Sequence, residues 1–513
     1  MLVYWDRKQT LNPRVHLRSA RGAGALDFLI ASGEVESGVA DALWPERDSE
    51  NETSRTLRRL SLAVAHAFLA SGPAPGIDLP FDLPPRVHVG IPEGYAYYCL
   101  YPETYASAAK VFVDVRGTVS IGVVGVRNIG SSLSAVVAAA LERTGCRVST
   151  WTVRPHGHPF DRRLSLTPEL ERTWREAPVD YWAIVDEGPG LSGSSITSVA
   201  SYLSGLGIPD DRIAFFPSWE PSGDQFVSEA ARRRWQRHAK YTGSWKAPFV
   251  AGDSLIELSA GAWRSHVFKS EDQWPAAQPQ HERRKFLDGE TKLWKFEGLG
   301  RFGKQKLERA ESLWKVGFGP RPLGFDGGFL QMEWLPGPRA SLSDAGDPDL
   351  VQTVGRYLGY LAHEWSVSDG ASSDLLREMI RVNTGREWTQ AIPAARSCVI
   401  DGRLMPHEWV RTPSGYRKTD CLHHHDDHFL AGPQGIGWDV AGASIEMALG
   451  AEATHTLARA CGVPETDLAF WRTAYTAFRL GYCELAARAL AGTPEETRFR
   501  SASARYGRAL PRA

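Results

Sequence analysis

The stretch that most constrains the fold is Tyr181–Ser198, YWAIVDEGPGLSGSSITS. Its apolar run predicts a short buried strand that ends in two acids, Asp186 and Glu187. Gly188–Gly190 interrupts regular structure, and the serines that follow open a helix with apolar periodicity. A helix N-terminus offers free N–H groups and the positive end of its dipole to a phosphate, while carboxylates at a strand tip suit sugar hydroxyls. The stretch therefore predicts a site for a ribose phosphate.

The same residues resemble the PRPP loop of type I phosphoribosyltransferases, which runs from a hydrophobic strand through two acids to Thr-Gly-x-Thr. Asp186 and Glu187 match the acidic pair, and Ser192–Ser195 matches the phosphate turn, with Ser in place of Thr and one extra residue before the turn. The resemblance implies that PRPP is bound by Asp186, Glu187, Gly190, Ser192, Gly193, Ser194 and Ser195.

A second strand–loop–helix unit lies earlier, at Val119–Leu141. The sequence predicts a strand at Ile121–Val126, a loop at Arg127–Ser132 and an Ala-rich helix that packs on a sheet. Arg127 and the loop N–H groups would make an anion site. In the family an early loop of this kind receives pyrophosphate, so the resemblance implies that Arg127 and Ser131 contact PRPP and that Arg127 is catalytic together with Asp186 and Glu187.

Between these units, Arg147–Arg163 predicts a strand that ends at Val153 and then a basic loop that begins with Arg154. Cations here would stabilise a pyrophosphate leaving group, and the family has a flexible loop at this place. Strands near residues 121, 148 and 183, with a further one at Ile213–Phe216, predict a parallel sheet. The resemblance also implies Mg²⁺, because hard oxygen ligands suit this ion and PRPP is bound with it.

The composition excludes several other classes of protein. A chain of 513 residues suggests two to four domains. The net charge of -1 gives no indication of a nucleic-acid or membrane surface. There is no long apolar run and no signal peptide at the N-terminus, and the six scattered cysteines contain no CxxC pair. We therefore expect a cytoplasmic protein with reduced thiols.

The Pro/Gln-rich stretch Trp274–Glu282, WPAAQPQHE, is expected to divide the chain. It separates two parts with different motifs, so the predicted organisation is a phosphoribosyltransferase-like domain at 1–272, a linker at 273–282 and a second domain at 283–513.

The second part begins with an alternating strand, Thr291–Phe296, centred on Lys295. A helix with Glu308 and Glu311 follows and ends near Gly317, and Phe329–Gly337 predicts another strand. This order resembles the small lobe of protein-kinase-like folds, in particular aminoglycoside phosphotransferase-like kinases.

The resemblance implies that Lys295 holds nucleotide phosphates and pairs with Glu308, with Glu311 as the alternative. Glu333 and Trp334, within Gln331–Trp334, would form the hinge over adenine. Glycines with GxGxxG spacing are present, but they follow Lys295 instead of preceding it.

The segment Arg417–Glu446 matches the catalytic part of such kinases in outline. The resemblance implies that Gly435–Trp438 is an apolar strand ending in a metal-binding Asp439. His428 stands where a metal-binding Asn is usual, Asp427 is an alternative ligand, and Asp420 or Asp426 is the catalytic carboxylate.

The histidine–aspartate cluster at 423–428 leaves several interpretations open. It is a divergent phosphotransfer loop, a dedicated transition-metal site, the HD dyad of metal phosphohydrolases, or a polar loop.

The expected fold class is α/β: a type I phosphoribosyltransferase-like parallel sheet with flanking helices, followed by an α+β two-lobed kinase-like domain. The expected function is transfer of ribose phosphate from PRPP, with Mg²⁺, to an unidentified small-molecule acceptor, together with an ATP-dependent kinase-like activity. The alternative is a regulatory protein that senses PRPP or a nucleotide and carries a pseudokinase second half. The sequence indicates neither the acceptor nor the oligomeric state.

Overall fold

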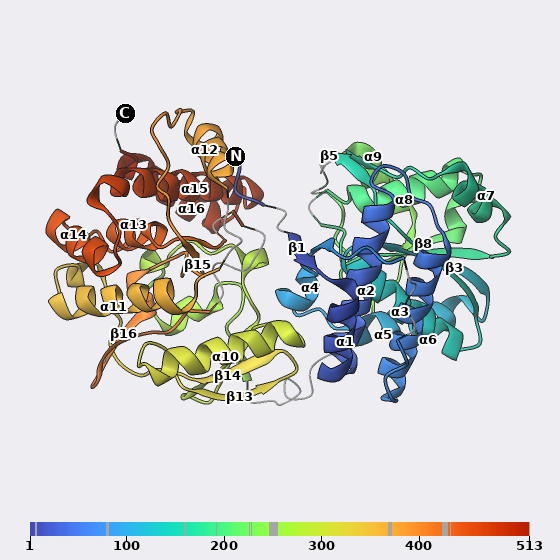
Figure 1. Ribbon diagram of the computed structural model, residues 1–513, viewed down its shortest axis with the longest axis horizontal. Helices are drawn as coiled ribbons and strands as arrows, with labels where there is room; N and C mark the ends of the chain where they lie inside the picture. Colours follow the sequence, from blue (N-terminus) through green and yellow to red (C-terminus); the bar gives the residue numbers. More distant parts are fainter. Residues whose placement is uncertain are drawn as a thin grey trace. The chain divides into compact units, whose positions relative to one another are not determined.

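The computed structural model contains two compact units (Figure 1). It describes residues 1–5, 8–77, 79, 82–158, 161–190, 192–224, 226, 228–245, 255–367, 372–422, 429–430 and 432–511. The parallel-sheet unit consists of Arg7–Ala251 with Leu299–Arg301. The antiparallel-sheet unit consists of Met1–Asp6, Gly252–Gly298 and Phe302–Ala513.

The parallel-sheet unit contains most of the alternating strands and helices that the sequence predicts. Its strands are β1 (Lys8–Leu11), β2 (Val87–Gly90), β3 (Ser120–Val126), β4 (Arg147–Val153), β5 (His156–His158), β6 (Asp161–Arg163), β7 (Tyr181–Val185), β8 (Ile213–Phe216) and β9 (Ala239–Lys240). Its helices are α1 (Pro13–Ala23), α2 (Ala25–Leu43), α3 (Glu52–Ala70), α4 (Glu93–Ala96), α5 (Pro102–Arg116), α6 (Ile129–Arg143), α7 (Pro168–Glu176), α8 (Ser194–Gly205) and α9 (Glu229–Arg237).

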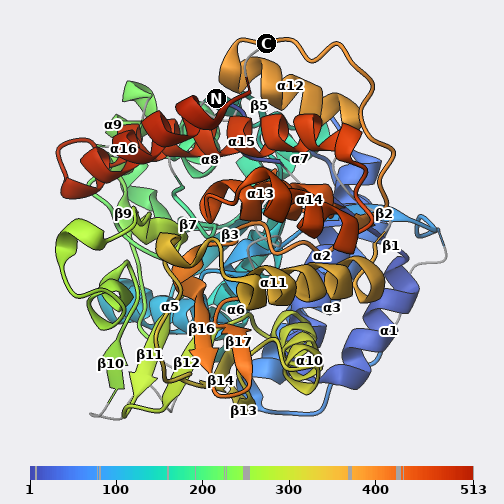
Figure 2. The same ribbon diagram turned by 90° about the vertical axis from the view of Figure 1, so that its left-hand side faces the viewer.

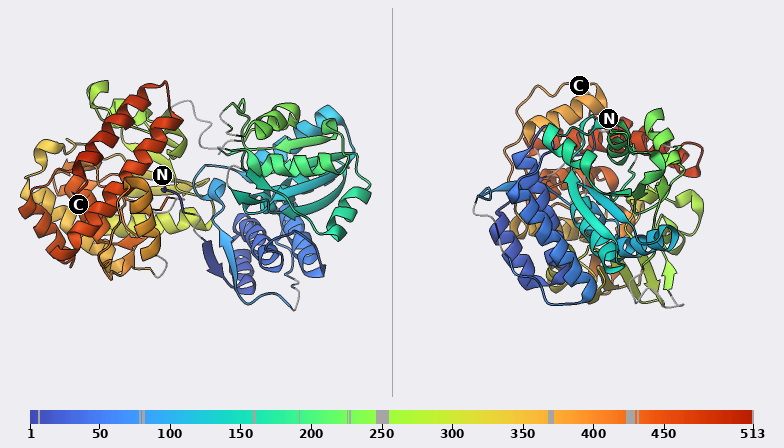
Figure 3. Two further views of the ribbon diagram at one scale, coloured as in Figure 1. Left: turned by 90° about the horizontal axis from the view of Figure 1, so that it is seen from above. Right: turned by 90° about the vertical axis from the view of Figure 1, so that its right-hand side faces the viewer.

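Five of these strands form one sheet in the order β4-β3-β7-β8-β9, and every neighbouring pair is parallel. The predicted parallel sheet is therefore confirmed. Helices cover both faces, as an all-parallel sheet requires (Figure 3). α6 packs on β3 and β4 and is itself covered by α2, α3 and α5, whereas α8 packs on β7 and β8.

Successive side chains of a strand point to opposite faces of the sheet, so the two faces of this sheet contribute to two separate apolar cores. Val124 and Ile184 belong to the apolar cluster that includes Ile196 and Val199 of α8. Their neighbours along the strands, such as Val123, are equally buried and point to the opposite face. Both faces of the central strands are thus covered, and only the strand ends are available for chemistry.

The antiparallel-sheet unit combines a sheet with a group of helices. Its strands are β10 (Leu255–Glu257), β11 (Lys285–Asp288), β12 (Lys292–Phe296), β13 (Pro322–Asp326), β14 (Phe329–Glu333), β15 (Ser397–Cys398), β16 (Trp409–Thr412), β17 (Gly415–Lys418) and β18 (Gln434–Gly435). Its helices are α10 (Arg301–Lys315), α11 (Pro348–Glu364), α12 (Ser373–Thr384), α13 (Gly437–Glu446), α14 (Ala451–Ala460), α15 (Leu468–Ala489) and α16 (Pro494–Ala509).

The five-stranded sheet of this unit has the order β10-β11-β12-β14-β13 and is antiparallel throughout. Figure 2 shows this sheet with α10 beside it, and the helices α12–α16 gathered away from it. One apolar cluster joins the two parts, since Leu330 of β14 and Leu313 of α10 share it with Tyr357 of α11 and Trp438 of α13. None of the helices in the described part of the chain combines the length and the apolar character that a membrane span needs.

The expected linker at 273–282 is not a linker in the structure. Ala277 and Gln278 are buried, and the Ala277 N–H donates to Glu495 Oε2 at 2.9 Å. Residues 255–298 all belong to the antiparallel-sheet unit. Pro279–His281 forms a short 3-10 turn.

The first residues of the chain belong to the antiparallel-sheet unit. Val3 is completely buried, and its carbonyl accepts a hydrogen bond from the Leu430 N–H at 2.7 Å. The Leu2 N–H donates to Asn383 Oδ1 at 2.6 Å, and the rings of Tyr4 and Phe429 stack with 5.3 Å between centroids. The N-terminal segment therefore forms part of the apolar core of the antiparallel-sheet unit.

We expect deletion of residues 1–5 to loosen the antiparallel-sheet unit alone. The deletion removes the buried Val3 side chain and leaves the Leu430 N–H without its acceptor, a cost of about 1–3 kcal/mol for the hydrogen bond. Hydrogen exchange followed by mass spectrometry should show faster exchange at Phe429–Leu430 and in α12. Exchange in β3 and β7 should be unchanged, and faster exchange there would contradict the assignment of the segment.

Candidate functional sites

The carboxyl end of β7 lies at the point where the sheet changes direction. From β3 the chain moves to one side to make β4, and it then crosses to the other side of β3 to make β7, β8 and β9. In open sheets of this kind, ligands bind outside the carboxyl ends of the strands at such a switch point. Asp186 and Glu187 follow β7 at this point, and Arg127 and Asn128 follow β3.

The side chains of Asp186 and Glu187 are partly exposed, and hydrogen bonds hold both of them in place. Asp186 Oδ1 accepts the Glu187 N–H at 2.8 Å, and Glu187 Oε2 accepts the Gly94 N–H at 3.0 Å. The backbone of the pair is fixed as well, since Tyr105 Oη donates to the Asp186 carbonyl at 2.7 Å and Ser218 Oγ to the Glu187 carbonyl at 2.6 Å. The two carboxylates are therefore preorganised.

Both carboxyl groups bind protons more tightly than usual. Burial raises the pKa of Asp186 to about 6, although the Glu187 N–H and then the charges of Arg162 and Arg154 act in the opposite direction. Burial and then the charge of Asp186 raise the pKa of Glu187 to about 8. Within the described residues neither carboxylate has an ion-pair partner inside 4.0 Å. At neutral pH Asp186 is mostly ionised and Glu187 mostly protonated, so the pair offers one charged acceptor to a cation or to hydroxyl donors.

The raised pKa values predict that the pair costs stability as pH rises. The folded protein keeps these protons up to pKa values of about 6 and about 8, whereas the unfolded chain loses them near pH 4. Stability is therefore lost as pH rises from about 4 through 8. Allowing for solvent screening of partly exposed groups, we expect a loss on the order of 1–3 kcal/mol. Comparing the melting temperature of wild type with that of the Asp186→Asn/Glu187→Gln variant between pH 5 and 9 isolates this contribution; parallel curves would contradict it.

The predicted phosphate turn leads into α8. Gly193 is the residue before the helix and has φ 61°, in the left-handed region. A Cβ there would lie 2.6 Å from the Phe226 ring. Both the backbone conformation and the lack of space therefore require glycine at this position. Ser192 Oγ lies 3.0 Å from Ser194 Oγ, and Gly190, with φ 57°, makes the turn after the acids. The Ser194 N–H donates to Ser192 Oγ at 3.2 Å, and Ser195 lies in the first turn of α8.

The loop after β3 is shorter than the sequence predicts, because α6 already begins at Ile129. Asn128 has φ 110°, which is uncommon for a residue other than glycine. Its side-chain Nδ2 donates to the Ile91 carbonyl at 3.1 Å, and its N–H donates to Ser37 Oγ at 3.3 Å. Strained backbone that the surroundings hold in place is typical of functional sites.

Arg127 and Ser131 do not face a ligand. The Arg127 guanidinium is 1% exposed and pairs with Asp48 Oδ1 at 2.5 Å and with Asp41 Oδ1 at 2.8 Å. Ser131 is completely buried, and its hydroxyl lies 2.8 Å from Ser37 Oγ. The prediction that these two residues contact PRPP is therefore corrected, since a guanidinium already neutralised by two aspartates holds the loop together instead.

Arginines of the predicted basic segment do lie near the acids. Arg154 pairs with Asp41 at 2.6 Å and is partly exposed, and Arg162 is on the hairpin that β5 and β6 form. The charges of Arg162 and Arg154 both lower the pKa of Asp186, against the larger effect of burial. The segment is therefore a β-hairpin whose cations act on the carboxyl end of β7.

In the antiparallel-sheet unit, Lys295 lies on the central strand β12 and is 4% exposed. Its Nζ donates to Asp420 Oδ1 at 2.8 Å, and Glu297 Oε1 lies 3.8 Å away. Asp420 follows β17 and keeps 27% of its side chain exposed. The structure thus brings together the two residues that the sequence named as the nucleotide lysine and the catalytic carboxylate.

Glu308 does not pair with Lys295. It is on the exposed face of α10, and Glu311 forms a surface pair with Lys315 at 3.6 Å. The buried face of α10 carries Lys306 and Arg309 instead. Burial and then the charge of Arg309 lower the pKa of Lys306 well below its usual value, and Lys295 contributes in the same direction. The sequence carried a signal for this face, namely the helical spacing of Gly303, Lys306, Ala310 and Leu313.

Asp439 does not end a strand. Gly435 ends the two-residue strand β18, and Asp439 lies in the first turn of α13, with 1% exposure. Its two carboxylate oxygens accept the N–H groups of Asp401 at 2.7 Å and Gly402 at 2.9 Å. Both carboxylate oxygens of Asp439 therefore hold the loop at 401–402. This corrects the expectation that Asp439 is a metal ligand at the end of a strand.

The loop that Asp439 holds contains Asp401, whose carboxylate contacts the buried Lys418. Lys418 is completely buried, and its Nζ donates to Glu408 Oε2 at 2.8 Å and to the Asp420 carbonyl, with Asp401 Oδ2 at 3.2 Å. Burial opposes the charge of Lys418, but Asp401 and then Glu408 raise its pKa above the usual value. Sequence reasoning missed this network, although the Lys-x-Asp spacing at 418–420 is visible after a strand.

The remaining predicted residues are divided between described and masked parts of the chain. Glu333 ends β14, and the Trp334 N–H donates to the Thr291 carbonyl at 2.7 Å, so both lie beside the end of β12 that is remote from Lys295. Asp426, Asp427 and His428, with the rest of the cluster 423–428, lie outside the described residues. Among the residues that are described, no group of three metal-ligating side chains gathers closely enough to hold an ion.

No protein-family model matches the chain, and no curated protein matches its sequence. Among solved structures, a choline/ethanolamine kinase family protein from Mesorhizobium loti is 14% identical, with 44% of this chain and 84% of that chain covered and a TM-score of 0.32. The choline kinase from Streptococcus pneumoniae is 13% identical over 44% and 90% of the two chains, with a TM-score of 0.29. The GDP complex of aminoglycoside 2'-phosphotransferase-IIIa is 12% identical over 44% and 88%, with a TM-score of 0.28.

Proposed function

We propose that the parallel-sheet unit binds PRPP with Mg²⁺ and transfers its phosphoribosyl group to a small-molecule acceptor. The observation that supports this most is the pair of preorganised carboxylates, Asp186 and Glu187, at the switch point of a parallel sheet. Carboxylates accept hydrogen bonds from ribose hydroxyls, and the positive end of the α8 dipole, with the turn at 192–195, suits the 5′-phosphate.

In the proposed reaction, the bond between C1 of the ribose and the pyrophosphate oxygen breaks, and pyrophosphate leaves with the electron pair. The acceptor forms a bond to C1 and loses a proton. Asp186 and Glu187 hold the ribose hydroxyls, and Arg154 and Arg162 supply positive charge next to the acids. A nearby Mg²⁺ would favour the ionised form of both acids and would neutralise the charge of the diphosphate.

The experiment that tests this function is the release of pyrophosphate. The full chain is incubated with PRPP, Mg²⁺ and a panel of nitrogenous bases, amines and small alcohols, and pyrophosphate is measured with a coupled assay. The proposal expects release that depends on one acceptor class and on Mg²⁺. Tight PRPP binding by calorimetry without release for any acceptor would favour a PRPP-sensing regulatory protein.

A second candidate function, phosphate transfer from ATP to a small-molecule hydroxyl, is favoured by the Lys295–Asp420 pair. In this proposal Lys295 provides positive charge for the nucleotide phosphates. Asp420 accepts the proton of the acceptor hydroxyl, whose oxygen forms a bond to the γ-phosphorus while the bond to the ADP oxygen breaks.

The second candidate predicts a thermal shift with Mg²⁺ and ATP. A ligand at 100 times its Kd stabilises the state that binds it by about 2.7 kcal/mol. Lys295→Ala should remove this shift. Lys292→Ala changes an exposed lysine on the same strand and should keep it. A wild type that shows no shift with any nucleotide would favour the pseudokinase alternative.

A further inference from the structure

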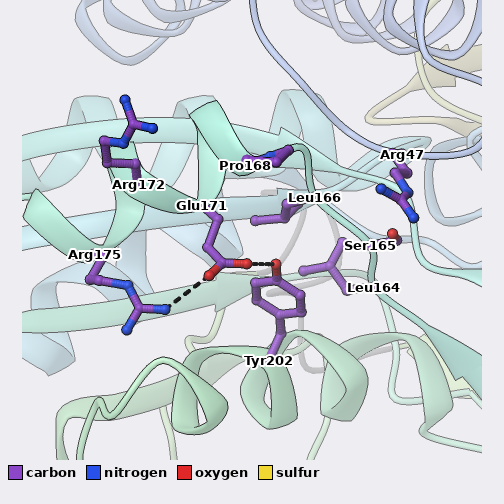
Figure 4. A pocket seen from close by; sticks show the side chains of 9 residues that line it. All are labelled: Arg47, Leu164, Ser165, Leu166, Pro168, Glu171, Arg172, Arg175 and Tyr202. Atoms are coloured by element: carbon purple, nitrogen blue, oxygen red, sulfur yellow. Dashed lines mark hydrogen bonds and ion pairs between the residues drawn. The ribbon is translucent and has the colours of Figure 1, made fainter.

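A surface cavity of about 620 Å³ lies in the parallel-sheet unit, away from the residues of the proposed PRPP site. It is formed by α7, α8 and the segment after β6, with Arg47 contributed by the segment after α2 (Figure 4). Its volume is in the range of small-molecule sites. None of its lining residues belongs to the carboxyl end of β7 or to the turn at 192–195.

The middle of the cavity is apolar and its ends are basic. Leu164 and Leu166 are almost fully buried and form the apolar part together with the Tyr202 ring. Figure 4 shows Arg47 beside Ser165 at one end and Arg172 with Arg175 at the other. Such a cavity suits a molecule with a flat apolar body and an anionic group.

The two ends differ in how far their charge is already neutralised. Arg175 pairs with Glu171 Oε1 at 2.9 Å, and Tyr202 Oη donates to Glu171 Oε2 at 2.7 Å. These two hydrogen bonds, that of Tyr202 first, lower the pKa of Glu171, so this carboxylate is ionised at neutral pH and repels an anion from its end. Arg47 has no ion-pair partner within 4.0 Å in the described part of the chain. The Arg47–Ser165 end is therefore the end for the anionic group.

The backbone around Arg47 is already ordered. The N–H of Asp48 donates to the Ser165 carbonyl, and the N–H of Thr167 donates to the Asp48 carbonyl, both at 2.8 Å. The Asp48 carboxylate in turn holds Arg127 at 2.5 Å and accepts the Arg154 N–H at 2.7 Å. Because this backbone is already held by hydrogen bonds, binding of a ligand at this end would cost little additional conformational entropy of the protein.

We propose that this cavity is a second ligand site, which binds a small aromatic anion. The ring lies on Leu164, Leu166 and Tyr202, and the phosphate or carboxylate group is held by the guanidinium of Arg47 and the hydroxyl of Ser165. Arg suits both anionic groups because its planar fork donates two parallel hydrogen bonds. This site does not depend on the proposed PRPP chemistry.

The test uses the full chain with phenyl phosphate and benzoate as probes, which separate phosphate from carboxylate, and inorganic phosphate as a probe without a ring. Binding is followed by ligand-observed NMR titration. At least one ring-bearing probe should bind at least tenfold more tightly than inorganic phosphate. Arg47→Gln should weaken this binding at least tenfold, and Arg172→Gln no more than about threefold.

Two controls make the result specific. Arg86→Gln removes one exposed arginine of the same unit outside the cavity and should leave binding unchanged. Asp186→Asn should also leave it unchanged, which separates this cavity from the proposed PRPP site. The proposal is overturned if neither ring-bearing probe binds the wild type, if inorganic phosphate binds as well as they do, or if Arg47→Gln behaves like Arg86→Gln.

Discussion

Replacing Asp186 by Asn together with Glu187 by Gln should weaken PRPP binding by more than tenfold while the chain stays folded. A hydrogen bond to a charged acceptor contributes about 1.5–3 kcal/mol, and 1.4 kcal/mol corresponds to a factor of ten. The amides keep the shape of the carboxylates, and the backbone of the pair is held by Tyr105 and Ser218, which the substitutions do not touch. Calorimetry with PRPP and Mg²⁺ measures the loss.

The matched control for this variant is Asp180→Asn, at the opposite end of the same strand. Asp180 Oδ2 accepts the Ser120 N–H at 3.0 Å, at the amino end of β7, where a parallel sheet does not bind ligands. PRPP affinity should be unchanged in this control. Unchanged affinity in the Asp186→Asn/Glu187→Gln variant would remove the basis for the proposed PRPP site.

Lys418→Met should destabilise the antiparallel-sheet unit by about 3–5 kcal/mol, the range found when one partner of a buried ion pair is removed. Methionine fills most of the volume of lysine, but it leaves the carboxylates of Asp401 and Glu408 without their cation. It also leaves the Asp420 carbonyl without a donor. Urea unfolding followed by hydrogen exchange in Trp409–Lys418 measures the change.

The effect of Lys418→Met should shrink at low pH, because protonated carboxyl groups no longer need a cation. Lys315→Met is the control: Lys315 has 66% of its side chain exposed and forms only a surface pair with Glu311. It should change stability by less than about 1 kcal/mol. Equal effects of the two substitutions, or an effect of Lys418→Met that does not depend on pH, would argue against a buried charge network.

The sequence predicted the parallel sheet well because its strands are short apolar runs between turn residues. Two acids follow Val185 directly, and such a change from apolar to charged residues shows the end of a strand from neighbouring positions alone. Arg127 was misjudged for the opposite reason. Its partners, Asp41 and Asp48, come from a distant segment whose position only the tertiary structure fixes. A basic residue in a loop looks the same whether it faces a ligand or two aspartates.

The wrong strand at Gly435–Trp438 shows another limit. Four apolar residues are too few for their periodicity to distinguish a strand from a helix. The small residues of α13 carried the missing signal: a Cβ at Gly437 would lie 2.3 Å from the Trp471 side chain, and one at Gly442 would lie 2.9 Å from that of Tyr475. Each of these glycines lies close to a side chain of α15 and so allows α13 and α15 to approach closely.

The burial of Val3 bears on how the chain is made. The parallel-sheet unit interrupts the antiparallel-sheet unit in sequence, so a ribosome completes the inner unit first and the host unit only much later. Leu2 and its partner Asn383 are 381 positions apart, and the N-terminal segment stays unpaired until that partner has emerged. The apolar segment at residues 1–5 thus has no native partner in the nascent chain while the parallel-sheet unit folds. Residues 1–5 are therefore synthesised before the parallel-sheet unit, but they reach their native place only after it.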